Sequence, residues 1–278
     1  MAASPRPQVS PPSAERITYA KAFGPIAEEY DRGRPGYPAT LLDDVLALPA
    51  GLPEPRVLEV GAGTGQATAG LARDGVPVHC LEPSRRMAGL LRERCAGRPG
   101  VQVTVTTFER WRPKHRYTLL VAAQSWHLVD PEVRLVKAAE VLRPGGAIAV
   151  WWHQIPQPVD RDRQHELNRI LHQEGFELQN FSPPPGADRT AAPSNGGWQQ
   201  RSPYFEPLPP KRYRTRALLS FGEYADLIAT YPEFRAMPAG SRKRALTRIA
   251  ESVFTAGPVD VTQVTMVNTA RRTNDCGS

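Results

Sequence analysis

The chain has 278 residues, 40% of them hydrophobic, a length that fits one large α/β domain with or without an inserted subdomain. No stretch approaches the roughly 20 consecutive apolar residues of a membrane helix, so an integral membrane protein is not expected. The net charge of +7 is spread thinly, with 19 basic and 15 acidic residues in positions 1–150, and no basic arm or stripe indicates a nucleic-acid partner.

The N-terminal residues 1–14 are rich in Pro and Ser and lack the apolar run of a secretory signal. We therefore expect a disordered N-terminus on a cytoplasmic protein. Cys80, Cys95 and Cys276 form no close pair and no metal-ligand spacing, which favours reduced, structural thiols. Arginine outnumbers lysine 30 to 5, a bias typical of a GC-rich bacterial genome.

Short β-prone runs alternate with helical segments through the first 150 residues. The runs are apolar on both faces, as buried parallel strands are. A β-α-β-α order predicts a parallel sheet with helices on both sides. The expected strands are 56–60, 76–81, 101–106, 117–122 and 147–152, and the expected helices are 65–74, 84–95 and 131–142.

The pattern changes after residue 153. Residues 154–212 are polar and broken by proline and glycine, with one expected helix near 160–174. The sequence then predicts a strand at 213–219, helices at 221–230 and 241–254, and a strand at 259–269. The fold class is therefore α/β, a doubly wound sheet of about seven strands, mostly parallel, with the last two strands forming an antiparallel edge.

A glycine-rich turn follows the first expected strand, where Val57–Gly65 reads VLEVGAGTG. Glycines at the carboxyl edge of a parallel sheet let the backbone turn sharply and approach a ligand. A dinucleotide fingerprint would place its third glycine at position 66, which is Gln66, and the Gly-Lys-Ser/Thr of a phosphate loop is absent. The spacing disfavours a dehydrogenase and favours a ligand without phosphates.

A second acid, Glu82, ends the second expected strand, 21 positions after Gly61. A carboxylate at that strand end can accept hydrogen bonds from both hydroxyls of a ribose. Alone, such a glutamate also suits the N-terminus of a helix. In order and at this spacing, Glu59, the glycines and Glu82 together favour nucleoside binding.

With these residues the chain resembles the class I S-adenosylmethionine-dependent methyltransferases, in the small-molecule branch that includes quinone-biosynthesis and carboxylate methyltransferases. The resemblance implies a Rossmann-like fold, S-adenosyl-L-methionine as cofactor and a small-molecule substrate. It divides the chain into a cofactor domain with an N-terminal helical lid (15–153), a substrate-cap insertion that serves as a lid (154–212) and a C-terminal part of the same domain (213–278). The matching segments are Phe23–Asp31, Arg34–Pro38, Val57–Gly65, Leu81–Met87, Ala122–Asp130 and Val141–Gly146.

The resemblance also implies roles for single residues. Glu59 and the loop backbone would hold the methionine part of the cofactor, and Glu82 the ribose. Tyr30 and Arg34 would close over the cofactor's carboxylate, which a guanidinium grips with two hydrogen bonds. Thr107 and Phe108 depart from the acidic-then-small pattern of the adenine-contact region. The expected cofactor-binding residues are Tyr30, Arg34, Glu59, Gly61, Ala62, Gly63, Gly65, Glu82, Pro83, Thr107, Phe108, Glu109, Gln124 and Ser125.

Methyl transfer is an in-line displacement at a carbon activated by positive sulfur, so the enzyme mainly supplies alignment and a dry site. A base is needed only if the nucleophile must first lose a proton. His127, after the fourth expected strand, is the candidate catalytic base, with packing in the pocket wall as the alternative. Trp126, His127, His153 and Tyr224 are the expected substrate-binding residues. Two histidines without a third ligand at clear spacing predict no metal site.

We therefore expect methyl transfer to a small, aromatic or indole-like specialised metabolite, in a monomer or homodimer. One alternative is a methyltransferase for a small carboxylic acid or a quinone precursor. Others are an RNA methyltransferase and a non-catalytic binding protein of the same fold. The diffuse charge and the absence of an Asn/Asp-Pro-Pro-Tyr/Phe motif disfavour RNA.

Overall fold

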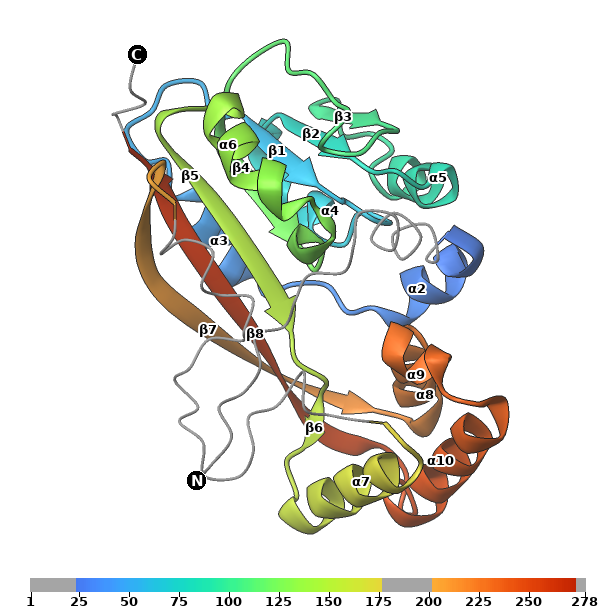
Figure 1. Cartoon of the computed structure of the whole chain (residues 1–278). Coiled ribbons are helices and arrows are strands. Elements are labelled where there is room, and N and C mark those ends of the chain that lie inside the picture. The colour runs from blue at the N-terminus through green and yellow to red at the C-terminus, as the bar shows by residue number, and fades with distance from the viewer. Residues whose placement is uncertain (1–23, 177–201, 274–278) are drawn as a thin grey trace.

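The structure, a computed structural model, describes residues 24–176 and 202–273. An eight-stranded sheet runs through this part of the chain in the order β3-β2-β1-β4-β5-β8 (Figure 1). The short β6 pairs with β8 beyond the end of β5, and β7 pairs with β8 as well. The strands are β1 Val57–Val60, β2 Val78–Leu81, β3 Val101–Thr104, β4 Tyr117–Ala123, β5 Leu142–His153, β6 Gln157–Pro158, β7 Phe205–Leu219 and β8 Val259–Arg272.

The sheet confirms the expected doubly wound arrangement. β1 to β5 are parallel, and β8 is antiparallel to β5, β6 and β7. The two-residue β6 raises the number of strands from the expected seven to eight. β7 begins at Phe205 rather than at residue 213. Pro207, Pro209 and Pro210 argued against a strand in this segment. Proline is tolerated here because β7 is an edge strand, where an N–H group that faces away from the sheet needs no partner.

Helices cover both faces of the sheet, and several begin at the capping residues that the sequence contains. Asp130, Asp160 and Ser220 each accept a hydrogen bond from a backbone N–H of the first helical turn. The helices are α2 Ala27–Gly33, α3 Ala39–Leu46, α4 Thr68–Leu71, α5 Arg85–Arg94, α6 Pro131–Val141, α7 Arg161–Gln173, α8 Phe221–Ala229, α9 Pro232–Ala236 and α10 Ala239–Ser252, with 3-10 turns η1 Gly24–Ile26, η2 Arg73–Gly75 and η3 Trp126–Leu128.

Two local expectations were wrong. The helix expected at 65–74 shrinks to α4: Gly65 adopts a left-handed φ of +92° that is not helical, and Arg73–Gly75 form the 3-10 turn η2. The strand expected at 147–152 begins earlier, because Leu142–Gly146 already belongs to β5. The pairing of this segment is irregular, with a shift of register where β5 pairs with Tyr117 and Leu119.

Alternate residues of the parallel strands enter two separate cores. Leu58 and Leu120 pack on one face beneath α6, whereas Val57, Leu119 and Ala149 pack on the other face against α3, α4 and α5. This burial on both faces explains why the strands read as continuous apolar runs. It also places their carboxyl ends, where the glycine loop begins, at one edge of the sheet.

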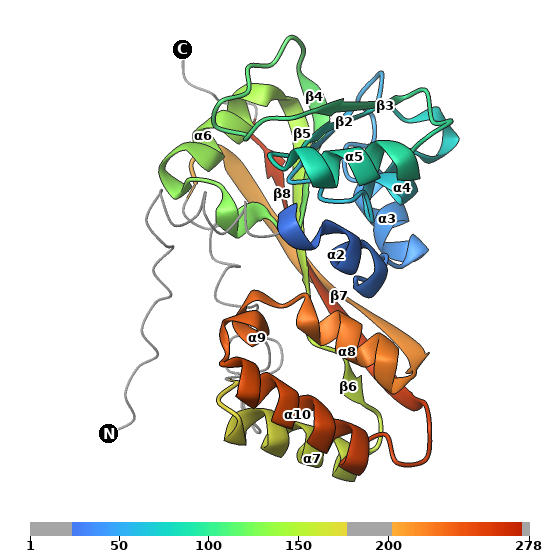
Figure 2. The ribbon, with the colours of Figure 1, turned by 90° about the vertical axis from the view of Figure 1, so that its right-hand side faces the viewer.

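A third core is built mainly by helices α7, α8, α9 and α10, which we call the cap, together with Val259 and Val261 of β8. Leu167, Ile170 and Ile249 are fully buried there. The long strands β7 and β8 run from the sheet to the cap, and α2 lies between the sheet and the cap (Figures 1 and 2). No helix among the described residues is long and apolar enough to cross a membrane.

The cap unites residues from both sides of the expected boundary at 212. α7 comes from the expected insertion 154–212, and α8 to α10 come from the expected C-terminal part. The division of the chain into these units therefore stays a prediction. The expected disorder of residues 1–14, and most of the segment between α7 and β7, fall outside the described residues.

Candidate functional site

The glycine loop after β1 is built by left-handed backbone conformations. Gly61, Gly63 and Gly65 have φ values of +68°, +59° and +92°. A Cβ at Gly61 would lie 2.5 Å from Cβ of Ser125, so only glycine fits there. A Cβ at Gly63 would make only ordinary contacts, with Met87 Cε at 3.7 Å and Tyr30 Cε1 at 4.0 Å, so there is no clash at this position. The loop therefore offers a cradle whose floor is bare backbone.

Glu82, at the end of β2, holds this loop through its carboxylate. Its Oε2 accepts a hydrogen bond from the N–H of Gly63 at 2.9 Å, and its Oε1 accepts one from the N–H of Ser84 at 2.8 Å. Burial raises the pKa of Glu82 to about 7, while these two hydrogen bonds act in the opposite direction. The acid that the sequence placed near the loop is thus in contact with it.

Glu59 lies under the loop and is completely buried. Its Oε2 accepts a hydrogen bond from the hydroxyl of Thr68 at 2.6 Å, and its Oε1 has no hydrogen-bond partner among the described residues. Burial raises the pKa of Glu59 to about 7, and the charge of Glu82 raises it further. The Oε1 atom can therefore accept a hydrogen bond from a donor group of a ligand.

Helix α2, which we call the lid because the family resemblance implies that role for it, lies against the loop. Tyr30 Cε1 lies 4.0 Å from the position that a Cβ at Gly63 would take. Arg94, from α5, ties lid and loop together, because its guanidinium contacts Asp31 at 2.5 Å and donates to the carbonyl oxygen of Thr64 at 2.9 Å. The lid is therefore held against the loop by a shared arginine.

Arg34, one residue beyond α2, is stacked between two tyrosines. Its Cζ lies 5.3 Å from the ring centre of Tyr30 and 4.1 Å from that of Tyr231. One terminal nitrogen donates to the carbonyl oxygen of Thr230 at 3.4 Å, and Nε has no hydrogen-bond partner among the described residues. A guanidinium in this position carries a charge that no described carboxylate neutralises by an ion pair, and it is suited to bind an anion.

The end of β4 contributes the next residues. Gln124 adopts a left-handed φ of +62°, and its Nε2 is buried without a hydrogen-bond partner among the described residues. Such strain in a residue other than glycine is typical of functional sites. Ser125 instead donates its hydroxyl hydrogen to the carbonyl oxygen of Val60 at 2.5 Å, so it fastens β4 to β1.

The two residues that follow have different surroundings. Trp126 belongs to the core beneath α6, with its ring centre 6.1 Å from that of Phe108. Burial lowers the pKa of His127 to about 4, and the charge of Arg134 lowers it further. His127 is therefore neutral near pH 7. It can accept a proton, but the imidazolium that results would be disfavoured.

The expected adenine-contact region, Thr107–Glu109, is bound to α6. Phe108 is buried in the core, and a carboxylate oxygen of Glu109 accepts from the N–H of Asp130 at 2.9 Å. Lys137 donates to the carbonyl oxygen of Glu109 at 2.9 Å. These contacts orient the loop after β3, and the role of the three residues toward a ligand stays a prediction.

His153 and Tyr224 lie in separate places. His153, at the end of β5, stacks on Tyr37 with ring centres 4.5 Å apart and shares a hydrogen bond of 2.8 Å with Thr265. Burial lowers the pKa of His153 to about 3. Tyr224 is buried in the cap core, 5.5 Å from Phe254 between ring centres. Their roles in substrate binding stay predictions.

The carboxyl edge of the sheet thus brings together most of the expected site. Sequence reasoning missed two aromatic residues there, Tyr37 and Tyr231. Tyr37 stood within a segment that carried the family resemblance and could have been singled out, whereas no local pattern marks Tyr231. The expected residues that gather at this edge are Tyr30, Arg34, Glu59, Gly61, Ala62, Gly63, Gly65, Glu82, Pro83, Gln124, Ser125 and His153.

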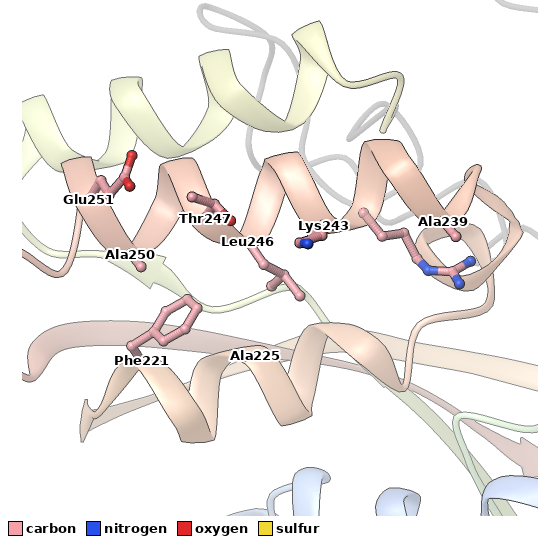
Figure 3. Close-up of a pocket in the computed structure, with 9 residues that line it drawn as sticks. Phe221, Ala225, Ala239, Lys243, Leu246, Thr247, Ala250 and Glu251 are labelled. Atoms are coloured by element: carbon pink, nitrogen blue, oxygen red, sulfur yellow. The ribbon is translucent and has the colours of Figure 1, made fainter.

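Two surface cavities lie away from this edge. One, of about 590 Å³, lies between α8 and α10, where Phe221 and Leu246 point toward the space between the helices (Figure 3). The other, of about 540 Å³, is lined by Arg56, Arg116 and Arg143 at the amino ends of the strands. No cluster of three metal-ligating side chains occurs in residues 24–176 and 202–273.

Comparisons with known proteins address the family directly. Residues 57–146 match the model of a family described as a methyltransferase domain. An uncharacterized methyltransferase of Mycobacterium tuberculosis is 30% identical over 243 residues, which cover 87% of this chain and 90% of that protein. A demethylmenaquinone methyltransferase of Tropheryma whipplei is 30% identical over 140 residues, which cover 47% of this chain and 56% of that protein.

A solved structure agrees at the level of the fold. A chain from Anaeromyxobacter dehalogenans, described as a type II methyltransferase, superposes with a TM-score of 0.61 at 21% identity, covering 86% of this chain and 97% of that chain. Fold, glycine loop and strand-end acid therefore agree with the family match. The chain belongs to the class I S-adenosylmethionine-dependent methyltransferases.

Proposed function

We propose that this enzyme transfers a methyl group from S-adenosyl-L-methionine to a small, aromatic specialised metabolite at the carboxyl edge of the sheet. The observation that carries the proposal is the contact between Glu82 and the N–H of Gly63, which unites the strand-end acid with a glycine loop that lacks a phosphate-binding pattern. S-adenosylmethionine, when bound, supplies an electrophilic methyl group on positively charged sulfur.

The residues at this edge are suited to that ligand. Gly63 presents backbone rather than a side chain to the methionine part of the cofactor, and Glu82 retains lone pairs for the ribose hydroxyls after accepting its two backbone hydrogen bonds. Arg34 offers a guanidinium for the cofactor's carboxylate. Buried polar atoms without described partners, Nε2 of Gln124 and Oε1 of Glu59, would find partners in a polar ligand.

Aromatic side chains support an aromatic acceptor. Tyr37 stacks on His153 and packs edge-on against Trp151, with ring centres 5.5 Å apart. Tyr30 and Tyr231 flank the same region. Flat faces of this kind favour a planar, apolar substrate and exclude water from the reacting atoms. His127 would then orient the acceptor or take its proton.

A second candidate acceptor is a small carboxylic acid or quinone precursor. An acidic acceptor would take the place of the cofactor's carboxylate at Arg34, which is half-buried and has no ion pair with a described carboxylate. The demethylmenaquinone methyltransferase of Tropheryma whipplei resembles part of this chain, which supports a quinone-like acceptor.

Binding and turnover can be tested separately. We expect titration calorimetry to detect S-adenosylmethionine and S-adenosylhomocysteine binding to the full chain, and Glu82→Ala to lose about 1–3 kcal/mol of that binding free energy. Transfer of a radiolabelled methyl group is then measured with matched panels of phenols, indoles, quinols and carboxylic acids. Unchanged cofactor affinity in a folded Glu82→Ala variant would contradict the proposed site, and labelling confined to the acids would favour the second acceptor.

A further inference from the structure

The cap contacts the lid at Arg34, a residue of the expected cofactor site. We propose that Tyr231 is a positioning residue, through which the cap orients Arg34 and so sets the enzyme's affinity for the amino-acid part of the cofactor. The inference rests on the proposed function, because it takes Arg34 to bind the cofactor's carboxylate. The inference gives the cap a role in cofactor binding, in addition to the substrate-cap role that the family resemblance implies for part of it.

The geometry around Arg34 carries the first step. Its guanidinium carbon lies closer to the ring centre of Tyr231, at 4.1 Å, than to that of Tyr30, at 5.3 Å. The hydrogen bond of 3.4 Å from Arg34 to the carbonyl oxygen of Thr230 also goes to the α8–α9 junction. Although Arg34 belongs to the lid in sequence, its closest ring contact and its hydrogen bond are with the cap.

The second step concerns how firmly the cap is placed against the lid. A Cβ at Gly33 would lie 2.8 Å from the carbonyl oxygen of Asp226, in the middle of α8. Backbones approach this closely only where a glycine stands, and the side chain of Thr230 also lies 3.2 Å from the same Cβ position, so α2 is packed closely against α8 and its C-cap. Tyr231 comes directly after this cap residue, so the packing places it next to Arg34.

The third step is electrostatic. Arg34 is half-buried, and a guanidinium that loses part of its hydration is costly unless an anion or an aromatic face compensates it. Glu233 on α9 favours the charge of Arg34, but the described contacts of Arg34 include no ion pair. Two aromatic faces hold the flat guanidinium while its Nε remains without a described partner. This arrangement leaves hydrogen-bond donors available for a carboxylate and fixes the plane in which they lie.

The experiment compares two ligands that differ in the group concerned. S-adenosylhomocysteine carries the amino-acid chain, whereas 5′-methylthioadenosine has the same adenosine and sulfur without it. For Tyr231→Leu we expect about a 3- to 30-fold loss of affinity for S-adenosylhomocysteine, the range of a desolvated cation–π contact, with less than about a twofold change for 5′-methylthioadenosine. Tyr231→Phe, which retains the aromatic face, should restore the ratio of the two affinities.

The controls separate a local effect from a loss of cap structure. Phe176→Leu alters the same core, where Phe176 packs against Phe234 at 5.8 Å, without touching Arg34, and should leave the ratio unchanged. In an Arg34→Gln background, Tyr231→Leu should cause no further change in the ratio of the affinities for S-adenosylhomocysteine and 5′-methylthioadenosine. If Tyr231→Leu does not fold, Tyr231→Met, which also lacks the ring but has a longer and more flexible side chain, takes its place.

The outcomes are distinguishable. Failure of the wild-type chain to bind S-adenosylhomocysteine would contradict the proposed function itself. Binding by the wild type with an unchanged affinity ratio in folded Tyr231→Leu would overturn the role of Tyr231 alone. An unchanged ratio in Arg34→Gln would show that Arg34 does not reach the cofactor and would overturn the inference as well.

Discussion

The buried acid beneath the glycine loop permits a sharp test of the structure. Glu59→Gln preserves the shape of the side chain and a carbonyl oxygen that can accept the hydrogen bond from Thr68. It removes only the ability to ionise, and it places an amide N–H₂ where Oε1 has no described partner. The unsatisfied amide lowers the free energy of unfolding by the same amount at every pH, because it does not titrate. The informative quantity is therefore the pH dependence of stability.

Burial, the largest cause, raises the pKa of Glu59 from 4.5 to about 7. The folded protein thus binds this proton more tightly than the unfolded chain, and unfolding releases it between those pH values. The stability due to the protonated acid is fully present below pH 4.5 and is lost as the pH rises through about 7. The difference corresponds to about 3 kcal/mol in total, of which roughly 2–3 kcal/mol falls between pH 5 and 8.

The assay is denaturant unfolding followed by tryptophan fluorescence at pH 5, 6, 7 and 8. Glu82, His127 and His153 also titrate with shifted pKa values, but both proteins contain them, so the difference between variant and wild type reports Glu59 together with its coupling to Glu82. We expect the free energy of unfolding of Glu59→Gln to increase relative to that of the wild type as the pH rises. A constant difference from pH 5 to 8 would show that Glu59 is not held protonated by burial, and would refute the reasoning.

Three further predictions concern the loop and the fourth strand. Glu82→Gln should weaken cofactor binding in calorimetry despite its similar shape, because an amide cannot accept from both the Gly63 and Ser84 N–H groups; wild-type affinity would contradict this. Gly61→Ala should lower the denaturation midpoint because its Cβ would collide with Ser125, whereas Gly63→Ala should stay folded and lose cofactor affinity; the opposite pattern would place the cradle elsewhere. If His127 is the base, His127→Ala and His127→Asn should both lose about 10²–10⁴-fold in kcat between pH 6 and 9. With His127 only orienting the acceptor, the Asn variant should retain kcat and change KM, and wild-type kinetics in both would remove His127 from the site.

Much of the fold was readable from local pattern. β1, β2 and β4 are buried on both faces, so each strand needs a run of apolar residues, and such a run is visible without knowing its neighbours. Helix starts were readable for the same reason, since a cap such as Ser220 with Glu223 lies within four residues. The glycine loop and Glu82 follow from strand ends that meet at one edge in any parallel sheet.

Other features depended on residues far apart in the chain. The prolines in β7 are compatible with a strand only because β7 lies at the edge of the sheet. The position of a strand in the sheet cannot be read from the strand's own sequence, so the prolines did not indicate a strand there. The lowered pKa of His127 and the raised pKa of Glu59 come from burial, which depends on packing by distant segments.

The sequence by itself determined the class of sheet, the position of the glycine loop and the acids beside it, because each is encoded within a few residues of one element. Only the tertiary structure decided how lid and cap meet. Arg34 and Thr230 are 196 positions apart, and Tyr231 reaches Arg34 only because Gly33 lets α2 pack directly on α8. Such a contact depends on the packing of whole helices, and no local periodicity records it.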